Sequence, residues 1–254
     1  MRVVSLLPSA TEMVAELGHR TDLVGRSAEC DFPPEVRSLP VVMRAKTLDS
    51  SAPSAEIDAR VRESRGRGES LYWLDLDLLR SLRPELLLTQ DLCGVCSVTE
   101  EEVGAACAAA GVSPRILSLT PRRLEDVIDS ARSIGRALGA PEVGERYAQR
   151  LSREWAAHGP VPAHAPRVAV LEWLDPPILA GLWVPEIIGR AGARPWHAPE
   201  AGAPGQPCRW SDLTEDPPDA VILSPCSFSV DRTADELASP ALEGLRDSLD
   251  GLRV

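Results

Sequence analysis

The chain lacks the motifs by which many nucleotide-binding and hydrolytic enzymes are recognised. It contains no P-loop, no G-x-G-x-x-G and no Ser-His-Asp order typical of a hydrolase. A zinc motif of the His-Glu-x-x-His or His-x-x-x-His type is also missing. Because catalysis has so little support in the sequence, we expect a protein that is not an enzyme.

Long apolar runs and clusters of basic residues are missing as well. No run approaches the roughly 18 apolar residues of a membrane span, and the chain opens directly into a strand-like segment without a signal peptide. We therefore expect a cytoplasmic protein as encoded, or an extracytoplasmic one if a leader was removed. The net charge of −11 argues against nucleic acid and an anionic membrane surface as partners.

Cysteines are too few for a disulfide scaffold, with six in 254 residues. Cys93-x-x-Cys96 is the start of either a metal site or a redox pair, and a second C-x-x-C is absent. Cys30 or Cys226 could complete a thiolate site only through the fold. Three interpretations stay open: a metal site built from these four cysteines, a redox or labile disulfide, and half-buried thiols that behave as small apolar groups.

Apolar segments alternate with amphipathic ones along the chain. The strands that this pattern predicts are 3–7, 23–25, 41–43, 86–89, 116–119, 167–171 and 218–223. The predicted helices are 9–18, 55–64, 76–82, 99–111, 124–138, 141–158, 183–192 and 233–249. We expect residues 193–209 to form a Pro- and Gly-rich loop. Strands that alternate with helices predict an α/β fold with parallel sheets.

The segment 141–158 divides the chain into two similar halves. Pro141 suits a first helical turn, and the apolar residues Val143, Tyr147, Leu151 and Trp155 recur every fourth position. Residues 185–192 and 218–223 weakly repeat residues 11–18 and 84–88, in the same order. We therefore expect an N-terminal α/β lobe over 1–139, a connecting helix over 140–160 and a C-terminal α/β lobe, possibly truncated, over 161–254.

Ligands of open parallel sheets bind outside the carboxyl ends of the strands, so the loops that follow the predicted strands are the candidate site. The candidates among them are 7–9, 29–31, 90–96, 172–177 with Trp183, and 224–228. None of these five loops carries Lys or Arg, which argues against a phosphate or a highly anionic catecholate chelate. Six Trp against two Phe and two Tyr favour contact with a large planar ligand, at Trp173 and Trp183 in particular. Ser9 and Glu12 have capping-box spacing, although the helix N-terminus they begin could instead face a ligand. The candidate ligand-binding residues are Ser9, Cys30, Asp31, Gln90, Cys93, Trp173, Asp175, Trp183, Cys226 and Phe228.

Five segments together carry a resemblance to a known family. They are SLLPSATE at 5–12, ECDFP at 29–33, QDLCGVC at 90–96, LEWLDPP at 171–177 and WVPE at 183–186. These segments resemble the leaderless branch of the cobalamin-binding, periplasmic-binding-protein-like family, within the helical-backbone metal receptors. The resemblance implies two α/β lobes, one rigid connecting helix, a ligand in the cleft between the lobes and an ABC importer permease as a possible partner. Members of this branch usually have His where this chain has Leu182, and they continue past the point where it ends.

The hypothesis that follows is a non-catalytic protein that binds a corrinoid, such as cobalamin, or a similar large metal chelate in that cleft. It needs no cofactor, and the corrinoid is its ligand. The alternative is an intracellular metal- or redox-active protein that uses Cys93 and Cys96 with Cys30 or Cys226.

Overall fold

The computed structural model describes residues 1–46, 52–92, 98–157, 159 and 161–254. The chain folds into two compact units. Unit 1 consists of Met1–Leu48, Val61–Pro121 and Glu125–Arg153, and unit 2 of Asp49–Arg60, Arg122–Leu124 and Glu154–Val254. Two short segments of the predicted N-terminal half therefore pack with unit 2.

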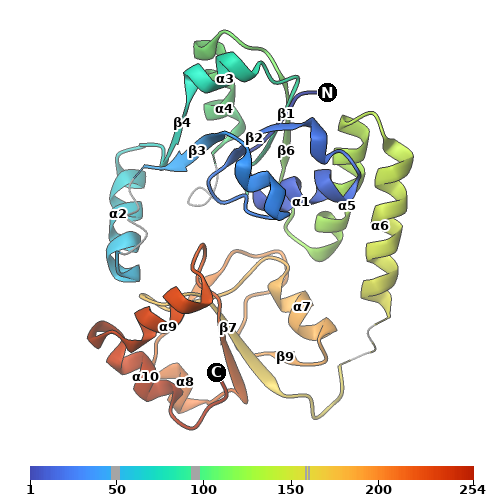
Figure 1. The fold of residues 1–254 in the computed structure, drawn as a ribbon. Coiled ribbons are helices and arrows are strands. Elements are labelled where there is room, and N and C mark those ends of the chain that lie inside the picture. Colours follow the sequence, from blue (N-terminus) through green and yellow to red (C-terminus); the bar gives the residue numbers. More distant parts are fainter. Residues whose placement is uncertain (47–51, 93–97, 158, 160) are drawn as a thin grey trace. The chain divides into compact units, whose positions relative to one another are not determined.

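A six-stranded sheet forms the centre of unit 1 (Figure 1). Its strands are, in spatial order, β4 (Tyr72–Leu74), β3 (Val41–Ala45), β2 (Leu23–Ser27), β1 (Val3–Ser5), β5 (Leu86–Gln90) and β6 (Arg115–Leu119). All neighbours are parallel except β3 and β4. The central strands β1 and β5 are buried along most of their length, as apolar runs in a parallel sheet require. The predicted α/β fold with parallel strands is confirmed, and β4 was missed because its three residues follow a polar stretch.

Helices pack on this sheet and build the core of the unit. They are α1 (Pro8–Glu16), α3 (Leu76–Leu82), α4 (Glu100–Ala110), α5 (Leu124–Ala137) and α6 (Pro141–Ala156), with short turns η1 (Arg20–Asp22) and η2 (Pro34–Ser38). Helix α2 (Ser54–Gly66) begins in unit 2 and ends in unit 1. One apolar cluster joins Val4, Leu79, Leu87 and Val103 from β1, α3, β5 and α4. Within the described residues, no helix is long and apolar enough to cross a membrane.

The start of α1 differs from the prediction. Its N-cap is Leu7, without a side-chain hydrogen bond, so Ser9 lies inside the first turn and the predicted capping box with Glu12 is wrong. Pro8 explains the shift, because proline has no N–H to be capped and fits the first helical turn. A capping box does form at α4, where Thr99 and Glu102 satisfy each other's backbone N–H groups.

Helices α5 and α6 lie side by side in unit 1 because two glycines let their backbones touch (Figure 1). A Cβ atom on Gly135 would lie 2.7 Å from Cα of Gly144, and one on Gly144 would lie 2.9 Å from the carbonyl oxygen of Ala131. The predicted connecting helix therefore exists, over 141–156, and most of its length packs on unit 1. Its last residues, from Glu154, belong to unit 2, where the Trp155 carbonyl accepts a hydrogen bond from Arg190.

Unit 2 is built around β7 (Arg167–Trp173). One edge of β7 pairs in parallel with β11 (Ala220–Leu223). The other edge pairs in parallel with β9 (Arg194–Pro195) and antiparallel with β8 (Ile178–Leu179), which in turn pairs with β10 (Gln206–Pro207). The second sheet is thus mixed. In both units the first strand neighbours the strand identified by the weak repeat, β5 beside β1 and β11 beside β7.

The helices of unit 2 are α7 (Val184–Arg190), α8 (Asp212–Glu215), α9 (Val230–Ala238) and α10 (Glu243–Leu249), with the turn η3 (Pro240–Leu242). The prediction of one helix over 233–249 is wrong, because Pro240 ends α9 and Ser239 before it is extended. The predicted loop over 193–209 contains two strands of two residues each, β9 and β10, that were not predicted. The core cluster of the unit includes Leu171, Trp196, Leu213 and Leu245.

Candidate ligand-binding site

The carboxyl ends of β1, β2 and β5 lie at one edge of the first sheet because these strands are parallel. The predicted ligand residues Ser9, Asp31 and Gln90 follow or end these strands. Ser9 and Asp31 are exposed, and Gln90 is half-buried. These three side chains are therefore brought to the same edge, where the strand-end rule places a ligand.

Cys30, the fourth predicted residue of unit 1, is completely buried. The hydroxyl of Thr11 donates to its Sγ at 3.0 Å, and the hydroxyl of Ser27 lies 3.1 Å from the same atom. A third contact at 3.9 Å joins Sγ to the Ser5 carbonyl oxygen. The thiol ties β1, α1 and the loop after β2 together, and in this conformation it has no surface to offer a ligand.

Carboxylates and one arginine surround the exposed part of this edge. Partial burial and the charges of Asp31 and Glu16 raise the pKa of Glu12 above its ordinary value. Arg37 of η2 donates to the Asp31 carbonyl at 2.8 Å and to its carboxylate at 3.5 Å. The loop itself contains no basic residue, as the sequence shows, but a guanidinium reaches it from six residues away.

In unit 2, two predicted residues form an aromatic pair at the carboxyl ends of β7 and β11. The rings of Trp173 and Phe228 meet edge to face, with centroids 5.4 Å apart. The guanidinium of Arg232 lies over the Phe228 ring, 3.9 Å from its centroid. The Trp173 Nε1–H donates to the Asp175 carbonyl at 3.1 Å, which fixes the indole. Aromatic pairs of this geometry contribute about 0.5–1.5 kcal/mol beyond the area they bury.

Arg232 and Glu236, which were not predicted as site residues, bind a distant segment to α9. Arg232 donates to the carbonyl of Ala52, and the backbone N–H of Ser54 donates to Oε1 of Glu236 at 2.6 Å. Their side chains are only 19% and 9% exposed. The four-residue spacing of Phe228 and Arg232 near the start of a helix could have indicated that the two side chains meet. It could not have indicated the contact with residues 52–54.

Asp175 lies half-buried in the loop after β7. Burial raises the pKa of its carboxyl group, and the charges of Asp58 and Glu236 raise it further. Three elements, α2, the β7–β8 loop and α9, therefore bring acidic groups near the aromatic pair.

Trp183 and Cys226 complete the predicted set in unit 2. Trp183 is the half-buried N-cap residue of α7, without a side-chain cap bond. Leu182 before it has a left-handed φ of 54°, and its backbone N–H donates to the Ala203 carbonyl. Cys226 is exposed in the loop after β11, where its N–H donates to the carbonyl of Glu172.

The structure brings no metal ligands together in the part of the chain that it describes, where no three His, Cys, Asp or Glu residues are placed to hold an ion. Cys93 and Cys96 lie outside the described residues, so a thiolate or redox site that involves them stays a prediction. Cys30, a predicted member of that site, is instead engaged by Thr11 and Ser27.

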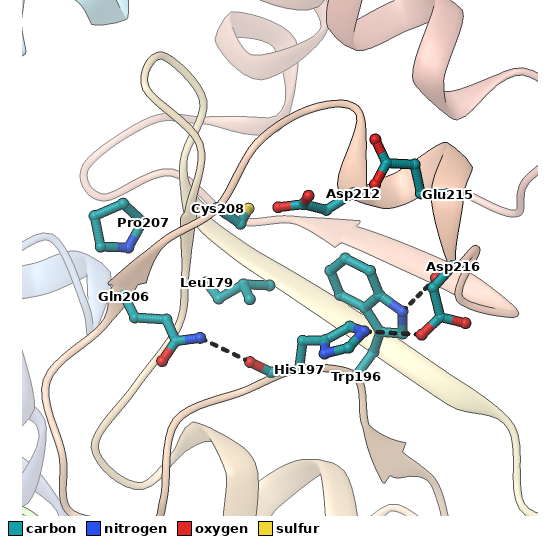
Figure 2. Close-up of a pocket in the computed structure, with 9 residues that line it drawn as sticks. All are labelled: Leu179, Trp196, His197, Gln206, Pro207, Cys208, Asp212, Glu215 and Asp216. Atoms are coloured by element: carbon teal, nitrogen blue, oxygen red, sulfur yellow. Dashed lines mark hydrogen bonds and ion pairs between the residues drawn. The ribbon is translucent and has the colours of Figure 1, made fainter.

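A separate cavity of about 370 Å³ lies in unit 2 and was not predicted (Figure 2). Its lining consists of Leu179, Trp196, His197, Gln206, Pro207, Cys208, Asp212, Glu215 and Asp216. Asp216 accepts from His197, from the Trp196 indole and from Arg167, the first residue of β7. Burial, with the charge of Asp212 nearby, raises the pKa of the Cys208 thiol to about 11. The lining of the cavity does not include Trp173 or Phe228, and its volume is at the low end for small-molecule sites.

Solved structures of periplasmic binding proteins have a similar fold. The periplasmic heme-binding protein RhuT of Roseiflexus sp. RS-1 matches 99% of this chain and 84% of its own, at 23% identity and a TM-score of 0.69. A periplasmic heme-binding protein of Pseudomonas aeruginosa matches 99% of this chain and 80% of its own, at 23% identity and a TM-score of 0.65. This chain has the fold of periplasmic chelate-binding proteins.

The vitamin B12-binding protein BtuF of Vibrio cholerae has the same fold at a lower similarity. It matches 92% of this chain and 78% of its own, at 17% identity and a TM-score of 0.61. No protein-family model matches the chain, and no curated protein matches it by sequence. The resemblance inferred from the five sequence segments is confirmed as a resemblance in fold.

Proposed function

We propose that this chain is a non-catalytic binding protein for a corrinoid or a similar large metal chelate. The observation that carries the proposal is the fold, which is shared over 92–99% of the chain with proteins whose names state heme or vitamin B12 as ligand. The loops at the carboxyl ends of the strands in each unit are the proposed contacts, as in other open parallel sheets.

The aromatic pair of unit 2 supports the proposal. Trp173 and Phe228 offer ring faces and edges at the ends of two neighbouring strands, and Arg232 and the Asp175 carbonyl hold both rings in place. A fixed aromatic surface loses little conformational entropy when a flat macrocycle packs on it. Exposed Ser9 and Asp31 and half-buried Gln90 supply polar contacts from unit 1. That both sets of loops contact one ligand in a cleft remains part of the proposal.

Equilibrium dialysis of the full chain against cobalamin, cobinamide and heme tests this function. We expect at least one chelate to bind with a dissociation constant of about 1 µM or lower, equivalent to about −8 kcal/mol. If none of the three binds at this concentration, the proposed function is wrong.

Substitution of the aromatic pair locates the binding. Trp173→Leu should raise the dissociation constant of the chelate about tenfold or more, which is a loss of ~1.4 kcal/mol of binding free energy. Trp73→Leu is the control, because Trp73 lies on β4, is 48% exposed and is outside the loops proposed as contacts. Equal losses in the two variants would remove Trp173 from the site.

A protein with this function would deliver its chelate to a membrane partner, and we propose an ABC importer permease for that role. Binding of the chelate-loaded chain to a corrinoid importer reconstituted in lipid nanodiscs measures this. A failure of loaded and empty protein alike to bind would leave only the chelate-binding part of the proposal.

A further inference from the structure

The charges beside the proposed chelate contacts are mainly negative on both units. In unit 1, the exposed carboxylates of Glu12 and Asp31 lie close enough for Asp31 to disfavour ionisation of Glu12. Exposed Glu29 precedes the same loop, and exposed Asp91 follows β5 at the same sheet edge. In unit 2, the charges of Asp58 and Glu236 act on Asp175 in the same sense.

The arginines near these loops donate to acceptors of the protein itself. Arg26 donates to the carbonyls of Ser27, Ala28 and Arg37. Arg37 is directed at Asp31, and its bonds are to that residue's carbonyl and carboxylate. A guanidinium that is satisfied in this way must give up those bonds before it can bind a ligand carboxylate.

The same holds in unit 2. Arg232 is 19% exposed. Its guanidinium donates to the Ala52 carbonyl, lies over the Phe228 ring and is 3.9 Å from the Glu236 carboxylate. Moving Arg232 toward a ligand would break its bond to the Ala52 carbonyl and leave the nearly buried Glu236 with one ionic partner fewer. A ligand carboxylate placed at these loops therefore meets like charge, and Arg26, Arg37 or Arg232 would have to give up bonds within the protein before it could compensate that charge.

We infer that the site prefers chelates whose periphery carries neutral amides or positive charge over chelates of the same size that carry free carboxylates. This inference rests on the proposed function and sharpens it, because it distinguishes ligand classes that share a flat metal-holding ring. Corrinoids with amide side chains belong to the favoured class. Heme, with its two propionates, belongs to the disfavoured one.

Two forms of one macrocycle isolate the charge. Dicyanocobinamide carries amides around the corrin ring, and dicyanocobyrinic acid carries carboxylates on the same ring with the same axial ligands. We expect the full chain to bind the amide form at least about tenfold more tightly at low salt, with the ratio falling as salt screens the repulsion. Equal binding, or tighter binding of the acid, overturns the inference and leaves the proposed function intact. If neither form nor heme binds, the proposed function itself fails.

Charge-neutral variants test which residues set the preference. Glu12→Gln combined with Asp175→Asn should tighten binding of the acid about threefold to tenfold and change binding of the amide form much less. Asp247→Asn is the control, because Asp247 is exposed on α10 and lies in neither set of loops. If the control reduces the ratio of affinities for the amide and acid forms as much as the double variant does, the net charge of the protein rather than the site sets the preference, and the inference is wrong.

Discussion

A single buried thiol joins three segments behind the proposed contacts of unit 1. Cys30 accepts from Thr11 and lies within hydrogen-bonding distance of Ser27, and its residue is 0% exposed. Cys30→Ala would remove the thiol contact of the buried Ser27 hydroxyl, while the Thr11 hydroxyl would keep the Leu7 carbonyl as a partner, and it should lower the free energy of unfolding by about 1–3 kcal/mol. Urea unfolding measures this change. Cys226→Ala, at an exposed cysteine, should stay within about 0.5 kcal/mol of the parent; equal effects at both sites would contradict a supporting role for Cys30.

The carboxyl group of Asp175 gives unit 2 a defined pH dependence. Its pKa in the folded chain is raised above the ordinary value of 3.8, which is its pKa in the unfolded chain. Between the unfolded and the folded pKa, the folded state therefore binds more protons than the unfolded state. Asp175 therefore costs no stability below about pH 3.8, and its cost develops as the pH rises through the folded pKa. Asp175→Asn should raise the melting temperature at about pH 7 and lose that advantage in acid. A calorimetric pH series that shows the same shift at every pH would contradict this assignment.

At the scale of elements, the contact of α5 with α6 depends on glycine. Gly144→Ala places a methyl group 2.9 Å from the Ala131 carbonyl oxygen and 3.0 Å from Cα of Gly135. The helices must then separate, which should lower the free energy of unfolding by about 1–3 kcal/mol. Gly104→Ala in α4 is the matched control, since its Cβ would meet nothing within 4 Å.

The control should gain about 0.5–1 kcal/mol from alanine's higher helix propensity. Chemical denaturation of both variants gives the comparison. If Gly144→Ala is as stable as Gly104→Ala, the close approach of the two helices is not what the glycines provide.

The sequence was most informative where an element is long or strongly apolar. The apolar run Leu86–Gln90 forms a central strand, and the segment after Pro141, in which apolar residues recur at every fourth position, forms α6. The two-residue strands β8, β9 and β10 gave no periodicity to detect, since they exist only through pairing with β7 and one another. Pro240 is a strong local indication of a helix end, and it divides the last predicted helix into α9 and α10.

At the scale of the whole molecule, the strand-end rule predicts which loops lie at the carboxyl ends of the strands, but it does not predict the burial or the contacts of each side chain in them. Exposed Asp31 and the Trp173–Phe228 pair follow from position in an α/β fold. Burial of Cys30 and the approach of Arg232 depend on contacts with residues 19 and 180 positions away. Such contacts leave no pattern in a single sequence, because partners that distant meet only when the chain has folded.

The proposed function makes both units contribute to one bound chelate, and hydrogen exchange measured by mass spectrometry tests this claim most directly. The full chain is compared with and without saturating cobinamide. We predict slower exchange in peptides that cover residues 8–12, 28–33, 173–178 and 224–230, and unchanged exchange around the cavity lined by Trp196 and Asp216. Protection confined to that cavity, or to the loops of one unit, while the ligand is fully bound would contradict the account.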